Sequence, residues 1–319
     1  MNARGRALYQ WQNIPGRLVK PFVKTGLIFA GTHQTSQKMQ RLLILFLGCS
    51  ISYSSLAQLR IGIFGGVANY QGDLVDKPYQ NSRGAAGLTL SYQLNSHFSL
   101  RAGLTLAKVA GADSLNKKEL RMRNLSFQSR ITEFSLVGEF NTFDLEQKNW
   151  SPYLFAGVAV YHFNPYTFDR SGNKVFLQPL STEGQGLPGY DRKPYALTQL
   201  AIPVGAGIKY NLSDHVRIAL EAGLRKLFTD YLDDVSGNYA DPNDLLAAKG
   251  QKAVDLSYRG GELPGGNPAY PAKGAQRGSP KYKDYYYFTG LHLSFLLPGG
   301  SERSYGGGKK NGYGCPSVF

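Results

Sequence analysis

His97 and Ser99 are the residues of this chain whose types and spacing come nearest to a nucleophilic site. The sequence of 319 residues contains 5 histidines, and His97 precedes Ser99 by two positions. Residues two apart share one face of a β-strand, which would place an imidazole beside a hydroxyl as in a base–nucleophile pair. No carboxylate is placed to orient the imidazole, as a triad requires. We therefore predict that both are turn residues and that the protein is not an enzyme.

Several aspartates lie in the longest interval between regular segments, where carboxylates could bind calcium. Their spacing does not match the D-x-D-x-D-G pattern of a calcium loop, so we expect a solvated acidic loop. No segment matches a phosphate-binding glycine loop or a zinc site, and the sequence predicts no metal, no cofactor and no small-molecule substrate. The aspartates concerned are Asp230, Asp233, Asp234, Asp241 and Asp244.

Positive charge is concentrated in the first 57 residues. The formal net charge is +14, from 36 Lys and Arg against 22 Asp and Glu. Half of that excess lies before residue 58, a region without a single acidic residue. Beyond it, basic and acidic residues are interspersed instead of forming the basic stripe of a nucleic-acid-binding surface. The charge therefore does not predict nucleic-acid binding.

Residues 39–57 have the pattern of a secretory signal peptide. Met39 lies between Lys38 and Arg41 and is followed by the apolar stretch 42–48, and Ser55-Leu56-Ala57 gives a small-x-small cleavage site. We predict cleavage between Ala57 and Gln58. Residues 1–38 are then an upstream extension from a misassigned start codon, with an unusually long basic leader as the alternative.

The two cysteines have different predicted fates. Acylation of Cys49 as a lipoprotein is an alternative that the short apolar stretch before it disfavours. If the chain is cut after Ala57, the exported protein keeps only Cys315. A lone thiol in an oxidising compartment predicts a disulfide with another chain or a free thiol.

Eight segments after residue 58 alternate between apolar and polar residues with the period of a β-strand. Each is about as long as the ~9–11 residues with which a tilted strand crosses a bilayer, whereas no run is long enough for a membrane-spanning helix. Glycine and aromatic residues are abundant, which also favours β structure. The segments are residues 59–67, 86–94, 98–106, 133–140, 153–163, 199–210, 216–225 and 285–296.

Long and short connections alternate strictly between these segments. The long ones are residues 70–83, 110–125, 164–197 and 227–284, and the short ones are 95–96, 142–151 and 211–214. Outer-membrane barrels combine long extracellular loops with tight periplasmic turns in this way. A sheet in lipid must also close on itself, because an unpaired strand edge is costly there. Residues 58–297 are therefore predicted to form an all-β, eight-stranded antiparallel outer-membrane β-barrel with both ends periplasmic, followed by a flexible periplasmic tail, residues 298–319.

The alternation also predicts which side chains face lipid and which face the lumen. Apolar faces should look outward, although the segment 153–163 is apolar on both faces and leaves its inward side open. An eight-stranded barrel is filled by its own side chains, so we predict no open pore. A soluble sandwich or lipocalin-like barrel would place the apolar face inward and is the alternative. The charged residues predicted to face the lumen are Arg101, Glu133, Glu139, Lys209, Arg217, Glu221, Arg225 and His292.

Tyrosines and phenylalanines gather at strand ends, where aromatic belts of membrane barrels lie. We predict interface positions for them. They are Tyr70, Tyr92, Tyr153, Tyr161, Phe163, Tyr210 and the run 285–287.

Several short segments resemble PorG, the outer-membrane barrel of the type IX secretion system. The likeness runs from about residue 58 to the end, and none is recognised for residues 1–38. The segments are residues 65–74 (GGVANYQGDL), 123–127 (RNLSF), 155–159 (FAGVA), 162–165 (HFNP), 178–180 (QPL), 182–186 (TEGQG), 228–236 (FTDYLDDVS), 276–278 (QRG) and 314–316 (GCP).

This resemblance implies a non-enzymatic role in protein export. PorG-like proteins associate with a periplasmic ring of PorK-like lipoproteins and PorN-like proteins, on which export of cargo depends. Under this interpretation Cys315 tethers the barrel to the ring, covalently or not. The alternative from another class is a small surface barrel that acts in adhesion or shielding through its long loops. A lipid-modifying enzyme is a third, since outer-membrane lipid A deacylases use a spacing similar to that of His97 and Ser99.

Overall fold

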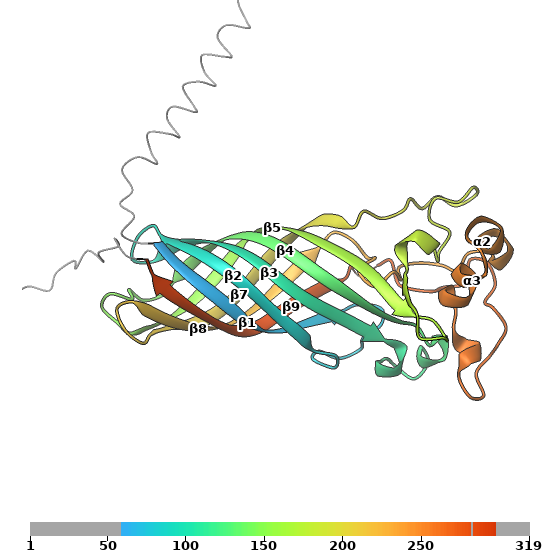
Figure 1. Ribbon diagram of the computed structural model, residues 1–319, viewed down its shortest axis with the longest axis horizontal. Helices are drawn as coiled ribbons and strands as arrows, with labels where there is room; N and C mark the ends of the chain where they lie inside the picture. Colours follow the sequence, from blue (N-terminus) through green and yellow to red (C-terminus); the bar gives the residue numbers. More distant parts are fainter. Residues whose placement is uncertain (1–58, 282, 298–319) are drawn as a thin grey trace, which may run out of the picture. The chain divides into compact units, whose positions relative to one another are not determined.

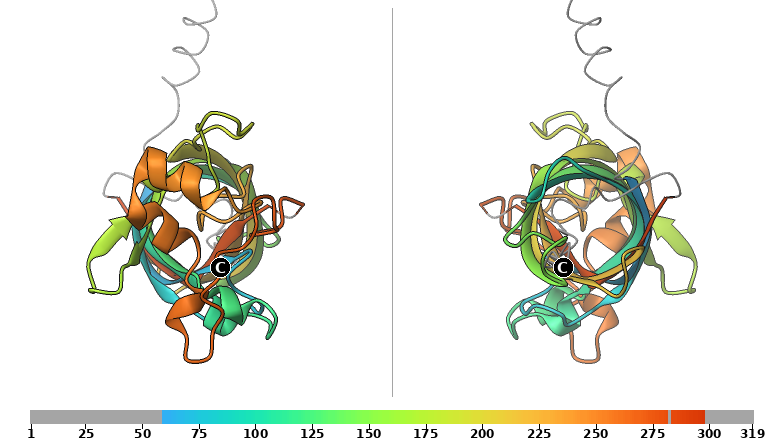
Figure 2. Two further views of the ribbon diagram at one scale, coloured as in Figure 1. Left: turned by 90° about the vertical axis from the view of Figure 1, so that its right-hand side faces the viewer. Right: turned by 90° about the vertical axis from the view of Figure 1, so that its left-hand side faces the viewer.

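In the computed structural model the chain forms a closed antiparallel β-barrel of eight strands (Figure 1). The structure describes residues 59–281 and 283–297. The sheet order is β4-β3-β2-β1-β9-β8-β7-β5, and pairing of β4 with β5 closes the ring that the end-on views show (Figure 2). The barrel strands are β1 (Leu59–Gln71), β2 (Arg83–Gln93), β3 (Phe98–Ala112), β4 (Ser126–Asn141), β5 (Trp150–Phe168), β7 (Thr198–Asn211), β8 (Val216–Leu227) and β9 (Tyr285–Leu296).

The two ends of the barrel differ in their connections. At the turn end, residues 94–97, 142–149 and 212–215 join the strands. At the loop end, residues 72–82, 113–125, 169–197 and 228–284 form a folded cap, seen beside the labels α2 and α3 in Figure 1. The predicted alternation of long and short connections is thus confirmed. We call the four long connections loops 1 to 4 in chain order.

The loops contain more regular structure than the sequence predicts. A ninth strand, β6 (Lys174–Phe176), pairs with the end of β5 outside the closed ring. Loop 4 contains helices α2 (Pro242–Lys249) and α3 (Gln251–Ser257), and the Asp241 carboxylate caps α2 by accepting a hydrogen bond from the backbone N–H of Asn243. The loops also include four 3₁₀ turns, Asp113–Leu115, Arg121–Arg123, Gln178–Leu180 and Gly260–Glu262. Among the described residues, no helix has the length and hydropathy that a bilayer crossing needs.

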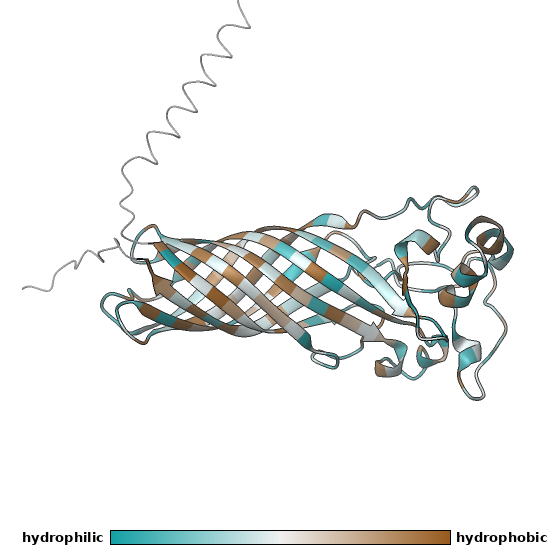
Figure 3. Cartoon of the chain, viewed as in Figure 1, coloured by the Kyte–Doolittle hydropathy of each residue, from teal (hydrophilic) through white to brown (hydrophobic). Residues whose placement is uncertain are grey.

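The outer surface of the strands is apolar, as the alternation predicts. Exposed Leu, Ile, Val and Phe side chains cover the barrel. The brown segments along the strands in Figure 3 mark hydrophobic residues. Leu88, Leu106, Leu154 and Val158 are each 59–61% exposed. A water-soluble barrel would hide such side chains in its core, whereas a transmembrane barrel presents them to lipid. The soluble alternative is therefore rejected, and the fold is that of an eight-stranded transmembrane barrel.

The prediction for the aromatic residues is wrong for most of them. Tyr70, Tyr153, Tyr161, Phe163 and Tyr286 are each no more than 2% exposed and point into the barrel. For Tyr70 and Tyr153 the physical reason is volume: Gly111 and Gly207 on other strands leave space that these rings fill. Tyr210 is exposed at the turn end as predicted, and the other exposed aromatic side chains there come from Phe98, Phe140, Trp150 and Phe295.

The structure shows which face of the strand 153–163 points into the lumen. Odd-numbered residues of β5 face the lumen and even-numbered ones face outward. Gly205 and Gly207 lie opposite: a Cβ built on Gly205 would come within 2.5 Å of the Phe155 ring, and one on Gly207 within 2.6 Å of the Tyr153 ring. Glycine on β7 is thus required by the aromatic inner face of β5.

Candidate functional site

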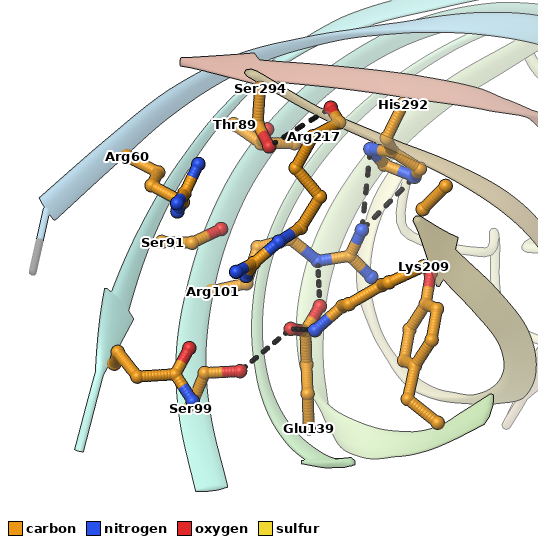
Figure 4. A pocket seen from close by; sticks show the side chains of 13 residues that line it. Arg60, Thr89, Ser91, Ser99, Arg101, Glu139, Lys209, Arg217, His292 and Ser294 are labelled. Atoms are coloured by element: carbon orange, nitrogen blue, oxygen red, sulfur yellow. Dashed lines mark hydrogen bonds and ion pairs between the residues drawn. The ribbon is translucent and has the colours of Figure 1, made fainter. Parts of the chain in front are cut away.

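The lumen near the turn end contains a network of buried charges centred on Arg101 (Figure 4). Its guanidinium donates from Nε to Glu139 Oε1 at 2.8 Å and from Nη2 to Glu221 Oε2 at 2.6 Å. The Arg101 Nη1 also lies 3.0 Å from His292 Nε2. One fork-shaped cation thereby joins β3, β4, β8 and β9, which suits the fixed geometry of guanidinium donors.

Glu139 is shared with a second cation. Lys209 Nζ lies 2.6 Å from Glu139 Oε2 and 2.9 Å from Asn141 Oδ1, and Ser99 Oγ donates to the same carboxylate at 2.8 Å. On the other side Tyr153 Oη donates to Glu221 Oε2 at 2.6 Å. Buried charges are costly unless they are paired and hydrogen-bonded, and here the carboxylates have several donors each.

A smaller network lies nearer the loop end of the lumen. Arg225 Nε is 3.2 Å from Glu133 Oε2, and Tyr286 Oη donates to the same oxygen at 2.7 Å. The Arg225 guanidinium also lies 4.2 Å from the centre of the Phe288 ring. All eight charged residues predicted to face the lumen do so, and seven of them are no more than 8% exposed, with His292 partly buried.

These networks close the lumen. The cavity among the charged residues of the turn end measures about 40 Å³, and the one above it, lined by Phe155 and Phe288, about 20 Å³. Such volumes hold one or two water molecules. The described part of the lumen therefore has no passage for a polypeptide.

The loops form a second network of buried polar residues, the loop network. In loop 2, Arg123 pairs with Asp113, with Nη2 2.6 Å from Oδ1, and the backbone N–H of Leu125 donates to Asp113 Oδ2. The same guanidinium donates to the backbone carbonyl of Asp73 in loop 1 at 3.0 Å and to that of Arg277 in loop 4. Arg123 therefore connects three loops.

Glu183 is the centre of the network in loop 3. Its carboxylate lies 2.6 Å from Arg192 Nη1 and 3.1 Å from Arg277 Nη1, and it accepts hydrogen bonds from the backbone N–H groups of Ser236 and Gly237. Arg277 also donates to the backbone carbonyl of Asp234 at 2.6 Å. Loops 3 and 4 are thus joined through side chains that water does not reach.

Asp234 is one of the buried acids of this network. Its carboxylate accepts hydrogen bonds from Thr182 Oγ1 at 2.6 Å and from Tyr195 Oη at 2.7 Å. Burial raises the pKa of Asp234 to about 6. The nearby Arg277 guanidinium opposes that rise.

A group of acids with fewer cations lies beside the loop end of the strands. Tyr70 Oη donates to Asp233 Oδ2 at 2.5 Å and to Asp284 Oδ1 at 3.2 Å. Burial, with the neighbouring carboxylates, raises the pKa of Asp233 and of Asp284 well above the usual value. Burial also raises the pKa of Asp230 to about 7. Protonation of these carboxyls below neutral pH removes the cost of burying like charges together.

The predicted solvated acidic loop is therefore wrong for three of its five aspartates. Asp230, Asp233 and Asp234 are no more than 3% exposed, because hydroxyl donors from β1, loop 3 and loop 4 itself, with the Arg277 guanidinium, cover them. Asp241 caps a helix, and Asp244 forms an exposed pair with Lys273 at 3.2 Å. Within residues 59–281 and 283–297, no group of three or more histidine, cysteine, aspartate or glutamate residues could hold a metal ion.

The structure separates His97 from Ser99. His97 lies in a turn, where its exposed ring stacks with Phe140 at 6.2 Å on the outer surface. Ser99 points inward and donates to Glu139. The prediction that both are turn residues is therefore confirmed for His97 and wrong for Ser99, because β3 begins at Phe98. The remaining predicted positions, the cleavage site Ala57–Gln58 and Cys315, lie outside the described residues.

Five of the nine segments on which the resemblance rests converge in the loop network. Segment 65–74 supplies Asp73, segment 123–127 supplies Arg123 and segment 182–186 supplies Glu183. Segments 228–236 and 276–278 supply Asp234 and Arg277. The period-2 pattern used to find strands does not detect such contacts, since these residues lie in irregular loops.

One family model matches part of the chain. Residues 37–179 match a family described as a domain of unknown function, DUF6089. No curated protein sequence matches the chain.

Solved structures with the same architecture are distant in sequence. Neisserial surface protein A shares 9% identity, with 75% of this chain and 97% of that chain covered and a TM-score of 0.39. OprG of Pseudomonas aeruginosa shares 11%, with 76% and 97% covered and a TM-score of 0.35. The outer membrane enzyme PagL shares 14%, with 75% and 99% covered and a TM-score of 0.30. These likenesses concern the fold alone.

Proposed function

We propose that this protein is a non-enzymatic outer-membrane component of a type IX secretion machinery. It sits in the outer membrane with the loop network outside and both chain ends in the periplasm. The observation that carries the proposal is that five segments resembling PorG, spread from residue 65 to residue 278, contribute to one buried loop network.

The filled lumen gives the barrel the properties of an anchor. Its cavities of about 40 and 20 Å³ are far too small for an unfolded chain. Cargo must therefore cross elsewhere, and this protein contributes by holding or organising a periplasmic ring of PorK-like lipoproteins and PorN-like proteins. Cys315 on the tail is the proposed tether to that ring.

The test is deletion of the gene followed by measurement of secreted cargo and of ring assembly. We expect cargo to accumulate in the periplasm, and mild solubilisation of wild-type membranes to recover the barrel with ring proteins. Non-reducing electrophoresis should show an adduct that a Cys315→Ser variant lacks. If no adduct forms in the native protein, the covalent tether is wrong, although the assembly role stands on the co-purification.

Normal secretion in the deletion strain would instead favour the alternative, a surface barrel acting in adhesion or shielding. In that case the barrel should be recovered without ring proteins. Cell attachment should then depend on loops 3 and 4.

A further inference from the structure

An unpaired cluster of basic side chains lies on the outer face of the barrel where the apolar surface ends. On β3 and β4 the even-numbered residues face outward, as the exposure of Leu106 and Phe134 shows. Lys108 is the next outward residue beyond Leu106 on β3, and it pairs in register with Arg130 on β4. Both cations therefore lie side by side on the loop side of the apolar band.

A third cation joins them from β6. Lys174 Nζ lies 3.9 Å from the centre of the Tyr166 ring, and Lys108 Nζ lies 6.0 Å from the same ring. Tyr166 itself donates to Gln128 Oε1 at 3.1 Å, which fixes the ring between the two ammonium groups. The strand β6, which is not part of the closed ring, is what brings Lys174 to this face.

A cavity of about 150 Å³ lies one outward position beyond Lys108 and Arg130 on their strands. Its wall includes Ala110, Gln128 and Phe168 of β3, β4 and β5, together with Asn81 of loop 1 and Arg83 at the start of β2. Ala110 and Gln128 are the outward residues beside Lys108 and Arg130. The site therefore combines a small hollow of mixed polar and apolar lining with four basic side chains, of which Arg83 lines the hollow itself.

The cations have no anionic partner in the described part of the chain. The ion pairs among residues 59–281 and 283–297 involve other basic residues and none of Arg83, Lys108, Arg130 or Lys174. Elsewhere in the cap, exposed lysines such as Lys252 and Lys273 are paired with aspartates. Clustered cations at a membrane surface attract anionic lipid headgroups.

We propose that this face binds the phosphorylated headgroup of a glycolipid of the lipid A type in the outer leaflet. Lys108, Arg130 and Lys174 contact phosphate, the 150 Å³ hollow receives part of the sugar, and the acyl chains lie on the apolar surface below. The inference rests on the membrane placement in the proposed function, but not on the secretion role.

The test compares lipid binding by the purified full chain in detergent, measured by native mass spectrometry. The probes are bisphosphorylated lipid A, dephosphorylated lipid A and inorganic phosphate. We expect the phosphorylated lipid to bind best and inorganic phosphate alone to bind undetectably. The triple variant Lys108→Gln, Arg130→Gln, Lys174→Gln should lose on the order of a hundredfold in affinity for the phosphorylated lipid, since each basic side chain near an anionic surface contributes about fivefold.

The matched control is the triple variant Lys118→Gln, Lys193→Gln, Lys249→Gln, which removes the same charge from exposed positions of the cap. It should bind like the native protein. Any of three results would overturn the inference. They are equal binding of both lipids by the native protein, an unchanged preference for phosphorylated lipid in the first triple variant, and an equal loss of affinity in the control. If the triple variant does not fold, as judged by heat-modifiable migration, the single Arg130→Gln variant should still show about a fivefold loss. Secretion assays are independent of this outcome, so the two proposals can fail separately.

Discussion

Arg277 and Glu183 form an ion pair across 94 residues of sequence, with Nη1 3.1 Å from Oε1 and side chains that are 2% and 0% exposed. Loop 4 supplies the cation and loop 3 the carboxylate. Because a buried charge that loses its partner is costly, this pair helps to hold the two loops together as a fixed body. The loop end of this barrel therefore behaves as a folded unit rather than as four independent loops.

Replacing Arg277 by alanine should loosen the cap and leave the barrel intact. Breaking a buried pair by removing one partner costs about 3–5 kcal/mol, and here it leaves Glu183 with Arg192 as its remaining cation. We expect rapid protease cleavage within loops 3 and 4 on membranes, with unchanged heat-modifiable migration of the barrel. Lys249→Ala, at an exposed end of α2, is the control and should resist cleavage as the native protein does.

Replacing Arg101 by alanine should destabilise the barrel itself. The substitution leaves Glu139 with Lys209 and Glu221 with His292, and it empties the centre of the lumen network. We expect the free energy of unfolding in detergent to fall by about 3–5 kcal/mol, measured by urea titration. Lys226→Ala, at an outward position of β8, should change it by less than about 0.5 kcal/mol. Similar losses in both variants would contradict a structural role of the lumen network.

The cap should be more stable at pH 5 than at pH 8. Burial raises the pKa of Asp230 to about 7 from about 4 in an unfolded chain. A raised folded-state pKa gives stability that is complete below pH ~4 and is lost as the pH rises through about 7. Between these pH values the free energy of unfolding falls by up to about 1.4 kcal/mol per pH unit for each such carboxyl.

Protease resistance of the cap, measured from pH 5 to pH 8, checks this dependence. An Asp230→Asn variant should weaken it, because the amide has no charge to bury. The pH dependence that remains in this variant should come from the carboxyls of Asp233 and Asp284, since their pKa values are raised as well. A cap that grows more resistant with rising pH would show that these acids are ionised and paired in the folded protein.

An arginine in the apolar band should cost more at its centre than at its edge. Leu136 and Thr132 are both outward residues of β4, four positions apart. In a membrane barrel an arginine costs about 2–4 kcal/mol at the bilayer midplane and about 0–1 near the interface. Leu136→Arg should therefore lower the unfolding free energy in lipid vesicles, and Thr132→Arg should leave it nearly unchanged. Equal losses of unfolding free energy in the two variants would show that the centre of the apolar band does not lie nearer to Leu136 than to Thr132.

The sequence alone determined the barrel and the charged residues of its lumen. Strict alternation, the order of long and short connections and the placement of Arg101, Glu139 and Glu221 on one face are local properties. They suffice because side chains of a strand alternate with period two, and because lipid on one side and a narrow lumen on the other demand opposite chemistry.

Only the tertiary structure decided where the strand-end aromatics and the loop acids lie. Tyr153 carries the same local signal as an interface residue, but Gly207 on the neighbouring strand makes room for its ring inside the barrel. Asp233 and Asp234 resemble solvated loop residues until Tyr70 and Arg277, distant in sequence, cover them. Burial of a polar group depends on partners that distant parts of the chain bring to it, and a local pattern carries no information about those partners.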